Sequence, residues 1–283
     1  MQNAVVLNSA VFRLARLIGP AIGGVLIAVY GPAVCYFVNF ASYAAILLAL
    51  AAMRVPPFVA TRRSRALLQD VADGLRYTLR RPLLRAVLVL ESTHSFFGVN
   101  TALITIIATD VLHAGPEGLG LLLSAQALGA LIGTTALLAS GDMEHKGRAM
   151  VVAGGAYCIV LALLGAANRF EVAALLLIAT AITDAYWTAM RNTMFQLQTD
   201  EAYRGRSLST VLLAGRGFTQ GAQLETGIAV SIGGPAFAVV SGAAVIAAVL
   251  AVVNLRTAEV RRFRGLPDAV AAATATIPGD PGA

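Results

Sequence analysis

The sequence predicts an all-α membrane protein with about eight transmembrane helices, and three observations support this fold class. Hydrophobic residues make up 58% of the 283 residues and charged residues only 13%, whereas soluble domains carry about 25% charged residues. The apolar residues come in continuous blocks of about 20 residues, the length of helix that crosses the hydrocarbon layer of a bilayer. The basic residues collect between these blocks. One water-soluble globule is therefore excluded, because too little polar material exists to cover its surface.

Each apolar block is predicted to be a helix, because the continuous runs lack the alternation that marks a barrel strand. The eight predicted spans lie at residues 5–29, 33–53, 83–111, 118–140, 149–167, 171–197, 207–231 and 234–255.

Positive charge is distributed unequally between the two sets of connections. Fifteen of the 21 Lys and Arg lie on the side that holds both termini, whereas the opposite connections contain only Arg169. Cytoplasmic loops carry the excess of Lys and Arg, so this rule predicts a multi-pass protein of the cell membrane with both termini in the cytoplasm. The net charge of +6 is then a topology signal, and no nucleic-acid partner is expected.

The connection at 54–82 is longer and more basic than the others. Pro56 and Pro57 end the preceding helix, and apolar residues then recur at helical spacing, which predicts a cytoplasmic linker that carries a surface helix. Two interpretations stay open for its basic face: attraction to anionic lipid headgroups, or a solvated face that fixes orientation. The tail at 256–283 is predicted to be cytoplasmic and disordered. The apolar residues of the predicted linker helix are Leu68, Val71, Leu75 and Leu79.

Enzyme motifs are absent from the sequence. It contains no HExxH, GxSxG, Walker A or dinucleotide-binding fingerprint, and no zinc-like Cys or His spacing, so neither an enzyme, a metal nor a cofactor is expected. His94, His113 and His145 fall in three different segments and are expected to be ordinary. Cys35 and Cys158 lie in different apolar blocks and are expected to be small buried residues.

Charges inside the apolar blocks are more informative, since a charge at the bilayer centre costs about 2.5 to 3.5 kcal/mol on insertion scales. Such residues normally face a bundle interior or a wet cavity. Two polar stripes follow from helical spacing, one on the sixth predicted span and one on the seventh. They predict a polar cavity that binds a small-molecule substrate. The stripe residues are Asp184, Trp187 and Arg191 on the first, and Arg216, Gln220 and Gln223 on the second.

These residues also permit structural interpretations. Arg191 could extend toward the cytoplasmic surface, or it could form a structural pair with Asp184. Glu91 lies about two turns inside its span, which makes it a candidate proton carrier alongside Asp184; the alternative is an acid that is hydrogen-bonded for packing.

Glycine pairs at i, i+4 spacing predict close helix contacts. Gly19 and Gly23 form one pair in the first span, where Pro20 removes a backbone donor, and Gly129 and Gly133 form another in the fourth span.

Several stretches resemble the major facilitator superfamily, and the nearest branch contains the enterobactin exporter and related drug/proton antiporters. The similarity runs in order from about residue 2 to 255. The stretches are LARLIGPAIGGVLIAVYG, DVADGLRYTLRRPLLRAV, LGLLLSAQALGALIG, GDMEHKGR and, most specifically, NTMFQLQTDEAYRGRSLS.

The resemblance implies a division of the chain into unequal parts. Residues 1–53 resemble family helices five and six of an N-terminal bundle, 54–82 the central loop, and 83–255 the six helices of the C-terminal bundle. Counterparts of family helices one to four are expected to be missing, so that the chain needs those helices or another chain to complete a transporter.

The family's packing and gating motifs transfer to specific residues. The end of its antiporter motif matches Gly19, Pro20, Gly23 and Gly24, and the resemblance implies that Gly19 and Gly23 meet the span that carries Gly129 and Gly133. Charged residues of two cytoplasmic loops resemble gating motifs: Asp142 and Arg148 in the first, and Asp200, Arg204 and Arg206 in the second.

Two functional hypotheses result. The first is a secondary active exporter of small organic compounds, drug-like or siderophore-like, that works by alternating access and exchanges its substrate for protons. The second is a truncated, non-transporting membrane relative that acts as a binding or assembly partner.

Overall fold

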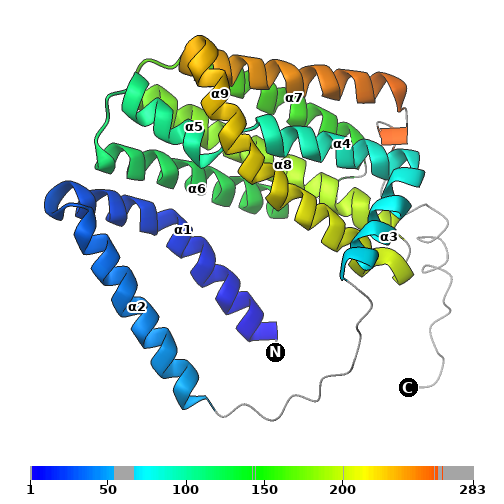
Figure 1. Ribbon diagram of the computed structural model, residues 1–283. Helices are drawn as coiled ribbons and strands as arrows, with labels where there is room; N and C mark the ends of the chain where they lie inside the picture. Colours follow the sequence, from blue (N-terminus) through cyan, green and yellow to red (C-terminus); the bar gives the residue numbers. More distant parts are fainter. Residues whose placement is uncertain are drawn as a thin grey trace.

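The computed structural model of the chain is all-helical throughout the part that it describes (Figure 1). It describes residues 2–53, 67–141, 143, 145–199, 201–257, 259–260 and 263, with the backbone alone at 2–10, 12–13, 67–71 and 201–216. The helices are α1 (Gln2–Tyr30), α2 (Pro32–Ala52), α3 (Leu67–Arg80), α4 (Pro82–Phe97), α5 (Thr101–Ile106), the π-helical turn η1 (Ile107–Val111), α6 (Pro116–Ala139), α7 (Lys146–Leu164), α8 (Phe170–Gln198) and α9 (Glu201–Arg256).

Helices long and apolar enough to cross a membrane dominate the described residues, which confirms the all-α membrane fold. Six such stretches occur there, and a shorter apolar helix covers Leu14–Tyr30. The sixth stretch, Gly217–Arg256, joins two of the predicted spans, because α9 turns back on itself at Gly234 (Figure 1). Gly234 has φ 80° and ψ 177°, a conformation that L side chains rarely adopt, and Pro235 begins the second arm.

The third predicted span is interrupted, which its sequence did not predict. α4 ends at Phe97, residues 98–100 are not helical, and α5 begins at Thr101. The side chain of Asn100 caps α5 by accepting a hydrogen bond from the Leu103 N–H at 3.0 Å. The Tyr157 hydroxyl on α7 accepts a bond from the Val99 N–H at 2.9 Å. A break inside a membrane helix is tolerated where neighbouring helices satisfy the freed backbone groups in this way.

The core lies among α4 to α9. α8 packs against α6 and α7, and α9 packs against α4 and α7. Trp187 on α8 is fully buried, and its indole fills the space beside Gly154 of α7, where a Cβ atom would collide with the ring. The two helices therefore approach closely at this point.

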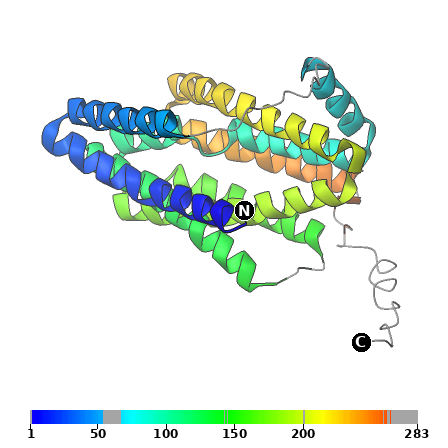
Figure 2. The same cartoon turned by 90° about the horizontal axis from the view of Figure 1, so that it is seen from below.

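α1 and α2 form a separate pair that touches this core through one face of α1 (Figures 1 and 2). α1 packs against α6, and α2 makes its main contacts with α1. α2 contains no buried residue, and its large apolar side chains, such as Phe37, Phe40 and Leu48, are exposed.

The contact between α1 and α6 is made by different glycines from those predicted. A Cβ atom at Gly24 would lie 2.5 Å from the Pro116 carbonyl oxygen and 3.2 Å from the Gly120 Cα atom. Around Gly19 and Gly23 no atom lies within 4 Å of such a position. The predicted contact between these two helices therefore forms, but Gly24 makes it instead of Gly19 and Gly23.

Gly129 and Gly133 serve a different helix pair. Both are buried against α8, where the nearest backbone atoms belong to Ile178 and Ile182, respectively. They do not meet Gly19 or Gly23, because Gly120 occupies the side of α6 that faces α1.

The helix predicted within the basic connection is present as α3, which packs against α9 (Figure 1). Arg81, at the junction of α3 and α4, donates a hydrogen bond to the Gln198 carbonyl oxygen at 3.0 Å and lies over the Tyr77 ring. Residues 54–66 of the predicted linker and 264–283 of the predicted tail lie outside the described residues.

A matched pair of neighbouring glycines tests the contact between α1 and α6. Gly24→Ala forces two backbones apart, and overpacking of this kind costs about 1 to 3 kcal/mol. Gly23→Ala makes the same chemical change one residue away, where space is open. We expect Gly24→Ala to lower the thermal unfolding midpoint of the detergent-purified protein and Gly23→Ala to leave it nearly unchanged. Equal midpoints for the two variants would contradict this packing.

Candidate functional site

A large cavity lies between α1 and the helices of the core. Its volume is about 1130 Å³, and it is lined from α1, α4, α5, α6, α7, α8 and α9 together with residues of the break at 98–100. The polar lining residues are Arg16, Glu91, His94, Ser95, Asn100, Thr101, Gln126, Tyr157, Thr180, Asp184, Thr188, Arg191, Thr219 and Gln223. A cavity of this size can take a drug-sized organic molecule.

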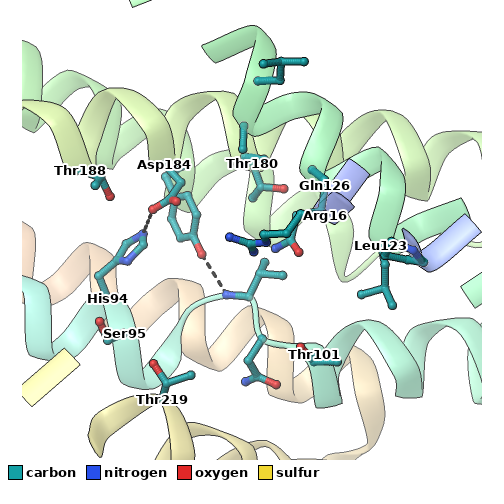
Figure 3. Close-up of a pocket in the computed structure, with 18 of the residues that line it drawn as sticks. Arg16, His94, Ser95, Thr101, Leu123, Gln126, Thr180, Asp184, Thr188 and Thr219 are labelled. Atoms are coloured by element: carbon teal, nitrogen blue, oxygen red, sulfur yellow. Dashed lines mark hydrogen bonds and ion pairs between the residues drawn. The ribbon is translucent and has the colours of Figure 1, made fainter. Parts of the chain in front are cut away.

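The polar stripe on α8 differs by one position from the predicted one. Thr180, Asp184, Thr188 and Arg191 line the cavity (Figure 3 shows the first three). Trp187, which we expected beside Asp184, is 0% exposed and belongs to the core. Residues three and four positions after Asp184 both lie near its direction on the helix, and the packing of the Trp187 ring against Gly154 leaves Thr188 on the cavity face.

Glu91 on α4 and Arg191 on α8 form an ion pair within this lining. Each side chain is only 12% exposed. Ser95 donates a hydrogen bond to Glu91 Oε1 at 3.1 Å, and Arg191 Nη2 donates one to Asn192 Oδ1 at 3.0 Å. Arg191 therefore has Glu91 as its partner, and the alternative in which it pairs with Asp184 is wrong.

His94 faces the cavity one turn after Glu91, contrary to the expectation that it is an ordinary residue. Its Nε2 atom lies 3.4 Å from Asp184 Oδ1 (Figure 3). Its ring stacks on Trp187 at a centroid distance of 5.4 Å and contacts Tyr157 at 4.4 Å. The Asp184 side chain is 44% exposed, so this carboxylate remains accessible from the cavity.

α9 contributes uncharged polar groups to the described lining. Gln223 and Thr219 line the cavity, whereas Gln220 is not among the lining residues. The side chain of Arg216 lies outside the described residues. One turn beyond Gln223, Thr226 accepts a hydrogen bond from the Asn100 amide at 2.8 Å, which ties the break between α4 and α5 to α9.

The predicted gating residues are only partly described. Arg148 is exposed in the first turn of α7. Asp142 and Asp200 lie outside the described residues, as do the side chains of Arg204 and Arg206. Their role as gate residues stays a prediction.

The polar lining residues that sequence reasoning did not place in the cavity include Arg16, His94, Gln126 and Tyr157. Figure 3 shows Arg16 of α1 and Gln126 of α6 near Thr180. A signal was present for three of them. Arg16 and Gln126 interrupt apolar blocks, and His94 lies three residues after Glu91, hence on the same helix face. Tyr157 gives no such signal, because tyrosine is ordinary in an apolar block.

The described part of the chain contains no group of three or more His, Cys, Asp or Glu side chains placed to hold a metal ion. What the cavity offers is hydrogen bonding, an accessible carboxylate and aromatic surface.

Comparison with known proteins places the chain among membrane transport proteins. The family described as transmembrane secretion effector, in the major facilitator group, matches residues 1–269. The multidrug efflux pump Tap of Mycolicibacterium fortuitum is 32% identical over 129 residues, which is 44% of this chain and 31% of that protein. The Tap pumps of Mycobacterium bovis and Mycobacterium tuberculosis are 30% identical over 129 residues, again 44% of this chain and 30% of theirs. The matched stretch thus spans about a third of these relatives.

The match over residues 1–269 includes α1 and α2, the basic connection and the whole core, so it covers every element that lines the cavity. The chain therefore belongs to the transmembrane secretion effector family of the major facilitator superfamily.

Proposed function

We propose that the protein acts in the export of small organic compounds across the cell membrane by alternating access. The observation that carries this proposal is the cavity of about 1130 Å³ between α1 and the core, lined by charged, polar and apolar groups. The names of the Tap relatives, multidrug efflux pumps, support a drug-like substrate. We further propose that the charge distribution reflects a topology with both termini in the cytoplasm.

The pair α1 and α2 and the core of α4 to α9 would form the two walls of the cavity that move during transport. α1 and α2 would correspond to part of one bundle and α4 to α9 to the other, with the cavity at their boundary. Rocking of one bundle against the other would open this cavity alternately to the two sides of the membrane. Helices from the rest of a longer protein, or from another chain, would complete the first bundle.

Of the two candidate proton carriers, Asp184 suits exchange better than Glu91. Glu91 is held by Arg191 and Ser95 and is 12% exposed, whereas the Asp184 carboxylate is 44% exposed toward the cavity. Asp184 can therefore meet a proton or the cationic group of a substrate, while Glu91 holds α4 against α8.

Replacement of Asp184 tests its role in transport. Asp184→Asn keeps the shape of the side chain and removes its charge, so we expect proton-driven transport of a fluorescent drug into everted membrane vesicles to fall at least about tenfold, equivalent to ~1.4 kcal/mol. Glu171→Gln is the matched control, because Glu171 is an exposed acid in the first turn of the same helix, outside the cavity. Unchanged transport by Asp184→Asn at equal protein level would remove Asp184 from the mechanism.

The ion pair makes a separate prediction about stability. Glu91→Gln leaves Arg191 buried without a counter-charge, and removal of one partner of a buried pair costs about 3 to 5 kcal/mol. The double variant Glu91→Gln with Arg191→Gln removes both charges, so we expect it to recover most of the lost thermal stability in detergent. A double variant less stable than Glu91→Gln alone would contradict this structural role.

Topology is tested with single cysteines in a background where Cys35 and Cys158 are replaced by alanine. Ser64→Cys lies in the basic connection and Ala114→Cys in the opposite one. In intact cells we expect a membrane-impermeant maleimide to label Ala114→Cys and to leave Ser64→Cys unlabelled until the cells are opened. The reverse pattern would invert the proposed orientation.

A further inference from the structure

We propose that His94 is a proton-binding site of the cavity, in which the imidazole gains a proton and Asp184 is its counter-ion. The use of this site in export rests on the function proposed above, but binding of the proton does not. The proposal follows from the partners that surround the ring.

One nitrogen of the imidazole lacks a hydrogen bond, although a carboxylate lies close to it. His94 Nε2 is buried and makes no hydrogen bond with acceptable geometry, although Asp184 Oδ1 lies only 3.4 Å away. An unsatisfied buried polar atom is costly. When the ring is protonated, both of its nitrogens carry hydrogens, and a small movement lets Nε2–H donate a charge-assisted bond to the Asp184 carboxylate.

The two aromatic rings that contact His94 also favour its charged form. Trp187 stacks on the imidazole with an interplanar angle of 17° and a centroid distance of 5.4 Å, and Tyr157 lies at 4.4 Å. A cation within about 6 Å of an aromatic face is attracted by the ring quadrupole. Burial alone opposes a charged imidazole, so a proton at this position must be held by specific partners, and these three residues provide them.

Other charged groups near the site are already neutralised or belong to other walls. Glu91, one turn before His94, is paired with Arg191 of α8. α6 and α9 contribute uncharged groups to the described lining, Gln126, Thr219 and Gln223 among them. The ionisable groups that line the cavity with His94 are Arg16 on α1, Glu91 on α4, Tyr157 on α7, and Asp184 and Arg191 on α8.

The site adjoins the interruption between α4 and α5. Tyr157 contacts the His94 ring with its own ring, and its hydroxyl accepts the hydrogen bond from the Val99 N–H. A change of charge on His94 therefore acts on Tyr157, whose hydroxyl holds the Val99 N–H in the break. In the proposed exporter, this contact would connect proton binding to the shape of a cavity wall.

The protein contains a reporter for this test, because Trp187 is its single tryptophan and stacks on His94. A protonated imidazole quenches indole emission more strongly than a neutral one. With the purified full chain in detergent, we expect Trp187 emission to fall in one transition between about pH 8 and pH 5, the range in which histidine changes charge. The measurement needs no substrate and no transport.

Three variants assign the transition. His94→Gln should abolish it, since the amide cannot titrate. Asp184→Asn should move its midpoint toward acid by about 1 pH unit or more, because the counter-ion is lost. The double variant His113→Gln with His145→Gln keeps His94 and should titrate like the wild type. Monodisperse elution in size-exclusion chromatography identifies variants that remain folded.

The outcomes separate this proposal from the one on export. A wild-type protein without a transition, a transition that survives in His94→Gln, or an Asp184→Asn midpoint equal to that of the wild type would overturn the proton site. Such a result would not contradict the proposal of drug export, which the vesicle assay tests separately. Conversely, a His94 transition in a protein that exports nothing would support the site and contradict its use in transport.

Discussion

The hydrocarbon layer of a membrane offers no hydrogen bonds, so every charge and every free backbone group inside the bundle must find its partner within the protein. The arrangement of α4 follows from this constraint. Its Glu91 forms an ion pair with Arg191 of α8. In the interruption that follows the helix, the Val99 N–H donates a hydrogen bond to Tyr157 of α7, and the Asn100 amide donates one to Thr226 of α9. The same ion pair and hydrogen bonds hold α7, α8 and α9 in place around α4.

The cavity is the place where this constraint is relaxed. A polar group that faces internal water keeps much of its solvation, so it can stay available for a ligand. The lining divides accordingly into two kinds of group. Glu91 and Arg191 satisfy each other and hold the walls together, whereas Asp184 keeps nearly half of its side chain accessible. The same few turns of α4 and α8 thus provide both the support and the reactive surface of the site.

The sequence predicts the helices well and the side-chain directions poorly, for physical reasons. A bilayer requires about 20 apolar residues for each crossing, and this requirement is visible in α2, α6 and α7 without any knowledge of their neighbours. The break after α4 is different, because it depends on Tyr157, 58 residues away from Val99. Trp187 and Thr188 illustrate a second limit. Helical periodicity places both near the direction of Asp184, and only the packing of α8 against Gly154 decides which of them enters the core.

The seam between α1 and α6 consists, at its closest point, of Gly24 and Gly120 resting on the backbones of Pro116 and Pro20. Interlocked side chains must change rotamer before two helices can shift, but a glycine surface has no rotamers to change. The same helix carries Arg16 and Pro20 into the cavity lining, so the spacing that Gly24 and Gly120 set between α1 and α6 also sets the width of the cavity on that side.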